Sequence, residues 1–116
     1  MVRNIGEARI IKNAGNGSGI LEKQTILDAE DMMGHGSILC RCILKPHSSI
    51  GSHFHNNEIE WYYVNRGKGN FIEGNGDITS IEAGQIGILG EDGCHGIQNT
   101  GTEDMEIFAL VLNNQS

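Results

Sequence analysis

Four residues of the types that bind metal ions are the most distinctive feature of this sequence. Three of them lie close together in the chain, and the fourth begins a predicted strand. His53 and His55 are two residues apart in "HFHNNEIEWYYVNRG" (residues 53–67), and Glu60 follows them. Residues two apart on a strand project to the same face, so both imidazoles should point the same way. Two imidazoles and a carboxylate that converge match the ligand set for Fe, Mn, Ni, Zn or Cu. His95, in "GEDGCHGIQN" (residues 90–99), is a fourth candidate.

The carboxylate of this set has two candidates, because Glu58 and Glu60 share one strand parity. A two-residue turn at Asn56 and Asn57 would place Glu58 across a hairpin from His55, since Asn tolerates positive φ. A four-residue loop would place Glu60 there and leave Glu58 at a solvated tip. The two-residue turn would bury two carboxylates beside one metal, where they would repel each other. We therefore favour Glu60.

Short apolar stretches separated by glycine must position these residues. The chain has 17 glycines and one proline, which is typical of an all-β sandwich or barrel. The stretches read as strands are "SILCRCILK", "SHFH", "IEWYYVN", "NFIE", "ITSIEAG", "QIGIL", "HGIQN" and "MEIFALVL". In the first of them Cys40, Cys42 and Leu44 should face the core. The pattern predicts an antiparallel jelly roll or small barrel.

Composition limits the partners. The chain of 116 residues is one domain in size, and its formal charge is −7 with only eight scattered basic residues. That balance argues against nucleic acid and against an anionic membrane surface as partners. No signal peptide or membrane-spanning stretch is read in the sequence, so we expect a cytoplasmic protein. Its three cysteines are expected to be reduced.

The stretch from residue 53 resembles the first motif of the cupin superfamily. The positions that fit are His53, His55, Glu60 and Gly67, while the opening Gly of the motif falls on His47. The second cupin motif is matched by Gly84, His95 and Asn99, but its Pro falls on Gly90 and its Gly on Asp92. The resemblance extends roughly over residues 38–112.

This resemblance implies a double-stranded β-helix that holds a divalent transition metal inside one end of the barrel. It implies a single domain over residues 1–116, with an N-terminal extension (1–20) and a core barrel (37–112). The implied metal ligands are His53, His55, Glu60 and His95, which would leave about two coordination positions open for water or substrate.

The lining of the expected site follows from strand alternation. Tyr62 shares the face of Glu60, and Cys40, Cys42 and Ile97 are expected to line the same lumen as substrate-binding residues. Tyr62 is either a donor or acid towards substrate or a core aromatic with a satisfied hydroxyl.

A basic partner for an anionic ligand is hard to place. Arg41 should face outward and Arg66 lies in a turn. An anionic substrate is therefore not favoured.

Two classes of function remain open. The first is a metal-dependent enzyme acting on a small polar metabolite by dioxygenase- or isomerase-type chemistry. The second is a non-catalytic cupin that binds or senses a sugar or acid.

A homodimer is expected, because "MEIFALVL" and much of "IEWYYVN" are apolar on both faces. A barrel of this size cannot bury both faces of an edge strand by itself. The leading segment "ARIIK" (residues 8–12) could pair with the sheet of the partner.

Overall fold

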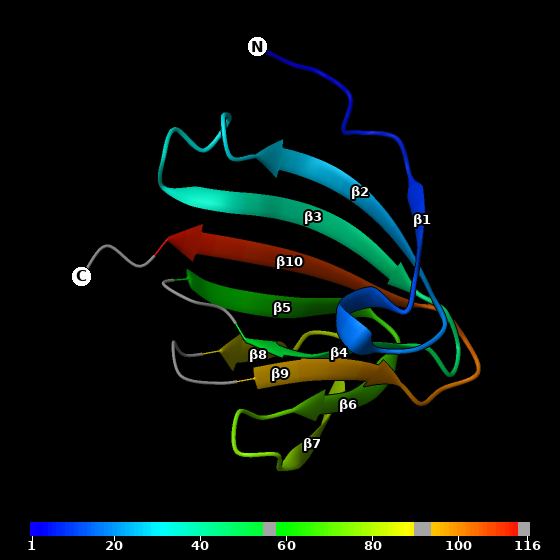
Figure 1. The fold of residues 1–116 in the computed structure, drawn as a ribbon. Coiled ribbons are helices and arrows are strands. Elements are labelled where there is room, and N and C mark those ends of the chain that lie inside the picture. The colour runs from blue at the N-terminus through cyan, green and yellow to red at the C-terminus, as the bar shows by residue number, and fades with distance from the viewer. Residues whose placement is uncertain (55–57, 90–93, 114–116) are drawn as a thin grey trace.

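The computed structural model describes residues 1–54, 58–89 and 94–113 of the chain. The elements are β1 (Arg9–Lys12), η1 (Ala14–Asn16), β2 (Ile20–Asp28), β3 (Gly36–Leu44), β4 (Ser49–Phe54), β5 (Glu58–Arg66), β6 (Lys68–Ile72), β7 (Ile78–Glu82), β8 (Ile86–Leu89), β9 (Cys94–Asn99) and β10 (Met105–Asn113). They form a six-stranded sheet, β1-β2-β3-β10-β5-β8, and a four-stranded sheet, β4-β9-β6-β7. All strand pairs are antiparallel, so the predicted all-β jelly roll is confirmed (Figure 1). Among the described residues, no helix is long and apolar enough to cross a membrane.

The core lies between the two sheets and follows the alternation of the strands. Cys40, Cys42 and Leu44 of β3 are all buried, as the sequence pattern predicts. Val64 of β5 and Ile107 of β10 are completely buried beside them. Burying each large aliphatic side chain of this kind contributes about 1.5–3 kcal/mol to folding, so this inner face fixes the register of the six-stranded sheet.

The last strand, β10, occupies a different place from the one we expected. It lies between β3 and β5, in the middle of the six-stranded sheet, and not at an edge. Its apolar residues alternate between the buried inner face, which includes Ile107, and a half-buried outer face that includes Leu110. A strand that is apolar on both faces is therefore a central strand here. One of its faces packs in the core, and the other lies on the outer face of the sheet.

The N-terminal part of the chain is built into the six-stranded sheet. Strand β1 pairs with β2 of its own chain, with Arg9 opposite Lys23 and Ile11 opposite Leu21. This differs from our expectation that the leading segment would reach the sheet of a partner. It also brings residues of the supposed N-terminal extension into the sheet that carries the core.

The connection from β4 to β5 changes sheets. Strand β4 pairs with β9 in the four-stranded sheet, whereas β5 pairs with β10 and β8 in the six-stranded sheet. The hairpin we expected between residues 53–55 and 58–60 is therefore wrong. The jelly-roll topology instead places β4 and β5 in different sheets.

A tight turn at Gly67 returns the chain from β5 to β6. Its φ of 92° lies in the left-handed region that favours glycine. A β-carbon at this position would also lie 2.9 Å from the carbonyl oxygen of Asp104. Both constraints explain why the chain needs glycine here.

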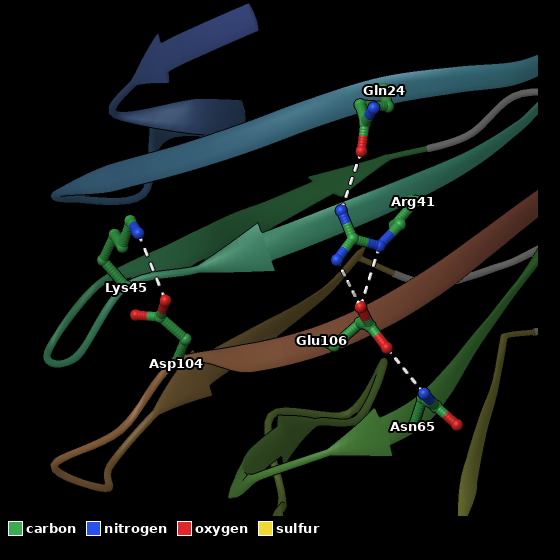
Figure 2. A network of polar contacts seen from close by, with 6 residues as sticks. All are labelled: Gln24, Arg41, Lys45, Asn65, Asp104 and Glu106. Carbon is green, nitrogen blue, oxygen red and sulfur yellow. Dashed lines mark hydrogen bonds and ion pairs between the residues drawn. The ribbon is translucent and has the colours of Figure 1, made fainter. Parts of the chain in front are cut away.

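A polar network lies on the outer face of the six-stranded sheet (Figure 2). The Arg41 guanidinium donates from Nε to Glu106 at 2.8 Å and from Nη1 to Gln24 at 2.7 Å, and its Nη2 lies 2.6 Å from Glu106. Asn65 donates to the other carboxylate oxygen of Glu106 at 2.6 Å. The Asn65 hydrogen bond, with help from the Arg41 charge, holds the pKa of Glu106 below its ordinary value. Arg41 therefore faces outward, as the alternation predicts.

Candidate functional site

A cavity of about 270 Å³ opens between the two sheets, beneath the η1 turn. Its lining includes Lys23, Cys40, Cys42, Ile50, Glu60 and Tyr62. These side chains come from β2, β3 and β5 of one sheet and from β4 of the other. The volume lies just below the usual range for ligand pockets, which suits a ligand of a few heavy atoms.

The η1 turn closes one side of this cavity. Ala14 and Gly15 belong to the lining, and the turn is held against β4 by backbone and side-chain hydrogen bonds. The Ser49 amide donates to the carbonyl of Ser18 at 2.8 Å, and the Ser18 amide donates to the Ser49 hydroxyl at 3.0 Å. A β-carbon at Gly51 would overlap the carbonyl oxygen of Gly15, so glycine at residue 51 permits the close approach.

The four expected metal ligands are placed only in part. His53 on β4 and His95 on β9 are Cα partners, so the backbone brings these two residues together on neighbouring strands. Glu60 is buried, with 6% of its surface exposed, and lines the cavity. His55 lies outside the described residues. Because Ile50 of β4 lines the same cavity, the strands that carry His53 and Glu60 border it from opposite sheets.

Glu58 and Glu60 have different surroundings. Glu58 accepts a hydrogen bond from the Ser37 hydroxyl and is not among the residues that line the cavity. Glu60 lies inside, on the strand between β10 and β8, with Val111 and Leu89 as its Cα partners. The assignment of the carboxylate ligand to Glu60 remains a prediction, and the burial of Glu60 beside the cavity supports it.

Tyr62 lies next to Glu60 in the cavity wall. It is buried and packs edge-on against Phe71, with ring centroids 6.4 Å apart and an interplanar angle of 84°. Burial, followed by the negative charge of Glu60, raises the pKa of Tyr62 well above its ordinary value. The hydroxyl therefore keeps its proton near neutral pH and can donate a hydrogen bond.

Cys40 and Cys42 form a thiol pair on the cavity wall. Their sulfur atoms lie 3.6 Å apart, and both are free cysteines. The hydrogen bond with Cys40, together with burial, raises the pKa of the Cys42 thiol. The pair offers a soft, weakly polar surface to a ligand. Ile97, which we expected beside these cysteines, is completely buried in the core and is not among the cavity-lining residues.

A family model described as "Cupin domain" matches residues 40–111 of this chain. The matched region spans β3 to β10 and therefore contains both motifs and most of the cavity. The chain belongs to the cupin family. The resemblance read in the sequence is thereby confirmed, as is the double-stranded β-helix that it implies.

Two comparisons relate this cupin to proteins of Thermotoga maritima. It is 35% identical over 102 residues to an "Oxalate-binding protein", covering 88% of this chain and 84% of the relative. It is 34% identical to the crystal structure of a "predicted oxalate decarboxylase", covering 97% of this chain and 99% of that chain with a TM-score of 0.91. An uncharacterized protein with a double-stranded beta-helix domain from Klebsiella pneumoniae is 25% identical, with coverage of 80% and 76% and a TM-score of 0.69.

The donor chemistry of this cupin fits a divalent metal, as is common in the family. Three imidazoles and one carboxylate form a set of nitrogen and oxygen donors that suits first-row transition metals. The structure describes only the backbone of His53 and His95, and His55 lies outside the described residues. The four expected ligands are therefore not seen as one group. Among the side chains that the structure describes, no three of the ligating types form a metal-binding group.

Asn99, the last residue of the second motif, has a structural role. It is buried, and its amide donates to the carbonyls of Leu44 at 2.9 Å and Glu103 at 2.8 Å. Its oxygen accepts a hydrogen bond from the Gly101 amide at 2.9 Å. All these partners are backbone groups, so Asn99 joins three chain segments at the end of the barrel away from ligand chemistry.

Lys23 is the charged residue of this cavity lining that the sequence analysis missed. It lies on β2 opposite Cys42 and belongs to the cavity lining. The sequence did not favour an anionic ligand because neither Arg41 nor Arg66 could be placed at the site, and the structure adds a lysine to the cavity lining. Its signal was weak, because "LEKQT" has one apolar residue followed by four polar ones and does not indicate which side chains face the interior.

Proposed function

We propose that this cupin binds a small carboxylic acid, with oxalate as the first candidate, at a divalent metal held by His53, His55, Glu60 and His95. The observation that carries the proposal is the small cavity bordered by a buried Glu60, by the strand of His53, and by a basic side chain. The names of the two Thermotoga maritima relatives support oxalate as the acid. A metal bound there would polarise an oxygen of the ligand.

The protein's own residues would orient the acid. Tyr62, whose hydroxyl also has a hydrogen bond with Glu60, would face the ligand. The thiols of Cys40 and Cys42 would line the same wall of the cavity, with β10 between their strand and that of Tyr62. The walls of the barrel would exclude bulk water, which strengthens each of these polar contacts. Ile97, the Cα partner of the lining residue Ile50, would act only as part of the core beside the cavity.

Turnover is the second candidate function. The hydroxyl of Tyr62 beside Glu60 favours it, because a protonated group next to a carboxylate can serve proton transfer to or from a bound acid. Decarboxylation, dioxygenase-type cleavage and isomerase-type chemistry are the reactions to distinguish. The three reactions differ in whether release of carbon dioxide, consumption of oxygen or a rearranged acid is observed.

We expect purified full-length protein to hold close to one equivalent of a first-row transition metal and to bind oxalate in the metal-loaded form. Elemental analysis measures the first and calorimetric titration of oxalate measures the second. Metal affinity should fall on acidification, because a histidine must be neutral to bind a metal.

A metal-free preparation that takes up none of Fe, Mn, Ni, Zn or Cu would contradict the metal site. Metal-loaded protein that binds no oxalate would contradict the ligand. Product formation or oxygen consumption with the bound acid would move the assignment from binding protein to enzyme.

We also propose that a second copy of this chain covers the outer face of the six-stranded sheet. That face has a groove of about 330 Å³ whose lining is almost entirely apolar, formed by Leu39, Trp61, Tyr63, Ile86, Phe108, Leu110 and Leu112. The charged groups beside it, Arg41 and Glu106, neutralise each other. An apolar groove beside a neutralised ion pair is where two chains of charge −7 can approach with little repulsion, and a two-fold pair of such faces is self-complementary.

We expect Leu110→Asp to convert the dimer to a monomer, since it places a charge at the centre of the apolar groove. Light scattering at micromolar concentration gives the mass, and circular dichroism checks that the variant is folded. The matched control is Ile78→Asp, because Ile78 is 63% exposed on β7 of the other sheet. A monomeric wild-type protein, or a folded Leu110→Asp dimer, would refute this interface.

A further inference from the structure

Strand β2 directs a lysine into the interior of the barrel. Leu21 and Lys23 lie opposite Leu44 and Cys42 of β3. Residues that face each other across two strands project from the same side of the sheet. Since Leu44 and Cys42 are buried in the core, Lys23 shares their inward face, and it is half-buried in the cavity lining.

A second cation stands beside this lysine. Arg9 on β1 lies directly opposite Lys23 and is exposed. Ile11, two residues further along β1, lines the cavity, so Arg9 is on the same face at the outer side. Like charges placed directly opposite each other across two strands repel, so this arrangement disfavours the folded state unless an anion comes between them.

Acidic partners are plentiful in the chain, yet this pair has none in the described structure. The chain contains 15 acidic residues, and three other cations have an acidic partner: Arg3 with Asp31, Arg41 with Glu106 and Lys45 with Asp104. Within the described residues, neither Arg9 nor Lys23 makes a hydrogen bond or ion pair through its side chain. An ammonium group in the cavity lining without an ion-pair partner among the described residues, with an exposed guanidinium next to it on the sheet, leaves a position for an anionic ligand.

We propose that Lys23 binds a carboxylate of the small acid in the cavity, and that Arg9 attracts the acid at the entrance. This inference rests on the proposed function and adds the residue that selects for negative charge. The cavity has Glu60 in one part of its wall and Lys23 in another, so a bound acid would lie between the candidate metal position and the ammonium group. The local positive charge also offsets the repulsion that a chain of charge −7 exerts on an entering anion.

The test is calorimetric titration of Mn(II)-loaded, full-length protein with oxalate, with the monoanion oxamate and with neutral oxamide. Lys23→Met keeps the length of the side chain and removes its charge. We expect it to weaken oxalate binding by about tenfold or more, which corresponds to the loss of one charge-assisted hydrogen bond. Lys23→Arg should restore much of the affinity, and the preference for oxalate over oxamide should shrink in Lys23→Met.

Two controls separate a contact from a general charge effect. Lys12→Met removes the same charge from β1, where Lys12 has the opposite parity to Arg9 and Ile11, and it should leave oxalate affinity almost unchanged. Arg9→Gln should slow oxalate association and weaken binding less than Lys23→Met does. Mn(II) affinity, measured by competition with a chelator, should be similar in all four variants.

The outcomes distinguish this inference from the proposed function. Equal oxalate affinities for wild type and Lys23→Met would contradict the role of Lys23 and leave the proposed function intact. Equal losses in Lys23→Met and Lys12→Met would show a general charge effect and also overturn it. Wild-type protein that holds Mn(II) but binds neither oxalate nor oxamate would contradict the proposed ligand and this inference together.

Discussion

Glu60→Gln is expected to lower the affinity for a divalent transition metal by tenfold or more, about 1.4 kcal/mol or above. The substitution keeps the size of the side chain and removes the anionic oxygen that a hard or borderline metal prefers. Glu60 is 6% exposed and lines the cavity, so little water is available to replace the lost ligand. Competition with a chelator of known affinity measures the change, with either Mn(II) or Zn(II) as the probe.

Glu58→Gln is the matched control for this prediction. Glu58 is two residues away on the same strand, accepts a hydrogen bond from Ser37 and does not line the cavity. We expect its replacement to change metal affinity less than about threefold, which is under 0.7 kcal/mol. If Glu58→Gln proves the more damaging variant, the carboxylate ligand is Glu58 and our assignment is wrong.

Arg41→Met is expected to lower the free energy of unfolding by about 2 kcal/mol at pH 7. The methionine keeps the apolar packing of the arginine stem but leaves Glu106 without its cation. The Glu106 side chain is 11% exposed and that of Arg41 is 33% exposed, so solvent screens the pair only in part. Urea unfolding followed by fluorescence of the single Trp61 gives the difference.

The destabilisation should depend on pH in a definite direction. The folded-state pKa of Glu106 is depressed, chiefly by the Asn65 hydrogen bond and also by Arg41. A depressed carboxyl pKa contributes stability above the unfolded-state pKa, and that contribution is lost as pH falls through the folded-state pKa. The difference between wild type and Arg41→Met should therefore shrink on acidification.

Lys45→Met provides the comparison on the same sheet. Lys45 and Asp104 are each 36% exposed and 3.2 Å apart, so their ion pair is well screened and should contribute under about 1 kcal/mol. A loss in Arg41→Met that is no larger than in Lys45→Met, or that stays constant from pH 7 to acid pH, would contradict the role assigned to the Glu106 network.

The parts of this fold that follow from local alternation were predictable from the sequence. Cys40, Cys42 and Leu44 face the core because a strand has a period of two and one of its faces is buried. The hairpin between β4 and β5 was a wrong prediction, since spacing fixes which residues share a face but not which sheet each strand joins. The central position of β10 was missed for the same reason: pairing between strands distant in the chain leaves no local signal.

The candidate site divides in a similar way. The candidate metal ligands could be named from the sequence because His, His and Glu at a fixed spacing are chemically distinctive, and their assignment stays a prediction. Lys23 was not found, because its role depends on β2 joining the same sheet as β3, which no pattern within residues 20–28 reveals. The placement of Cys40 and Cys42 in the cavity followed from alternation, whereas Ile97 shared their predicted inward orientation but lies in the core beyond the cavity.

The contact between η1 and β4 has a consequence for how such a protein can diverge. The segment that follows β1 is held to the strand that carries His53 by hydrogen bonds between Ser18 and Ser49. Glycine at residues 17 and 51 permits this close approach. Most surface loops absorb inserted residues at little cost, but an insertion here would push the strand beneath it. Drift in ligand preference should then proceed by exchange of side chains on β1 and β2, with the length of the chain between residues 12 and 20 held constant.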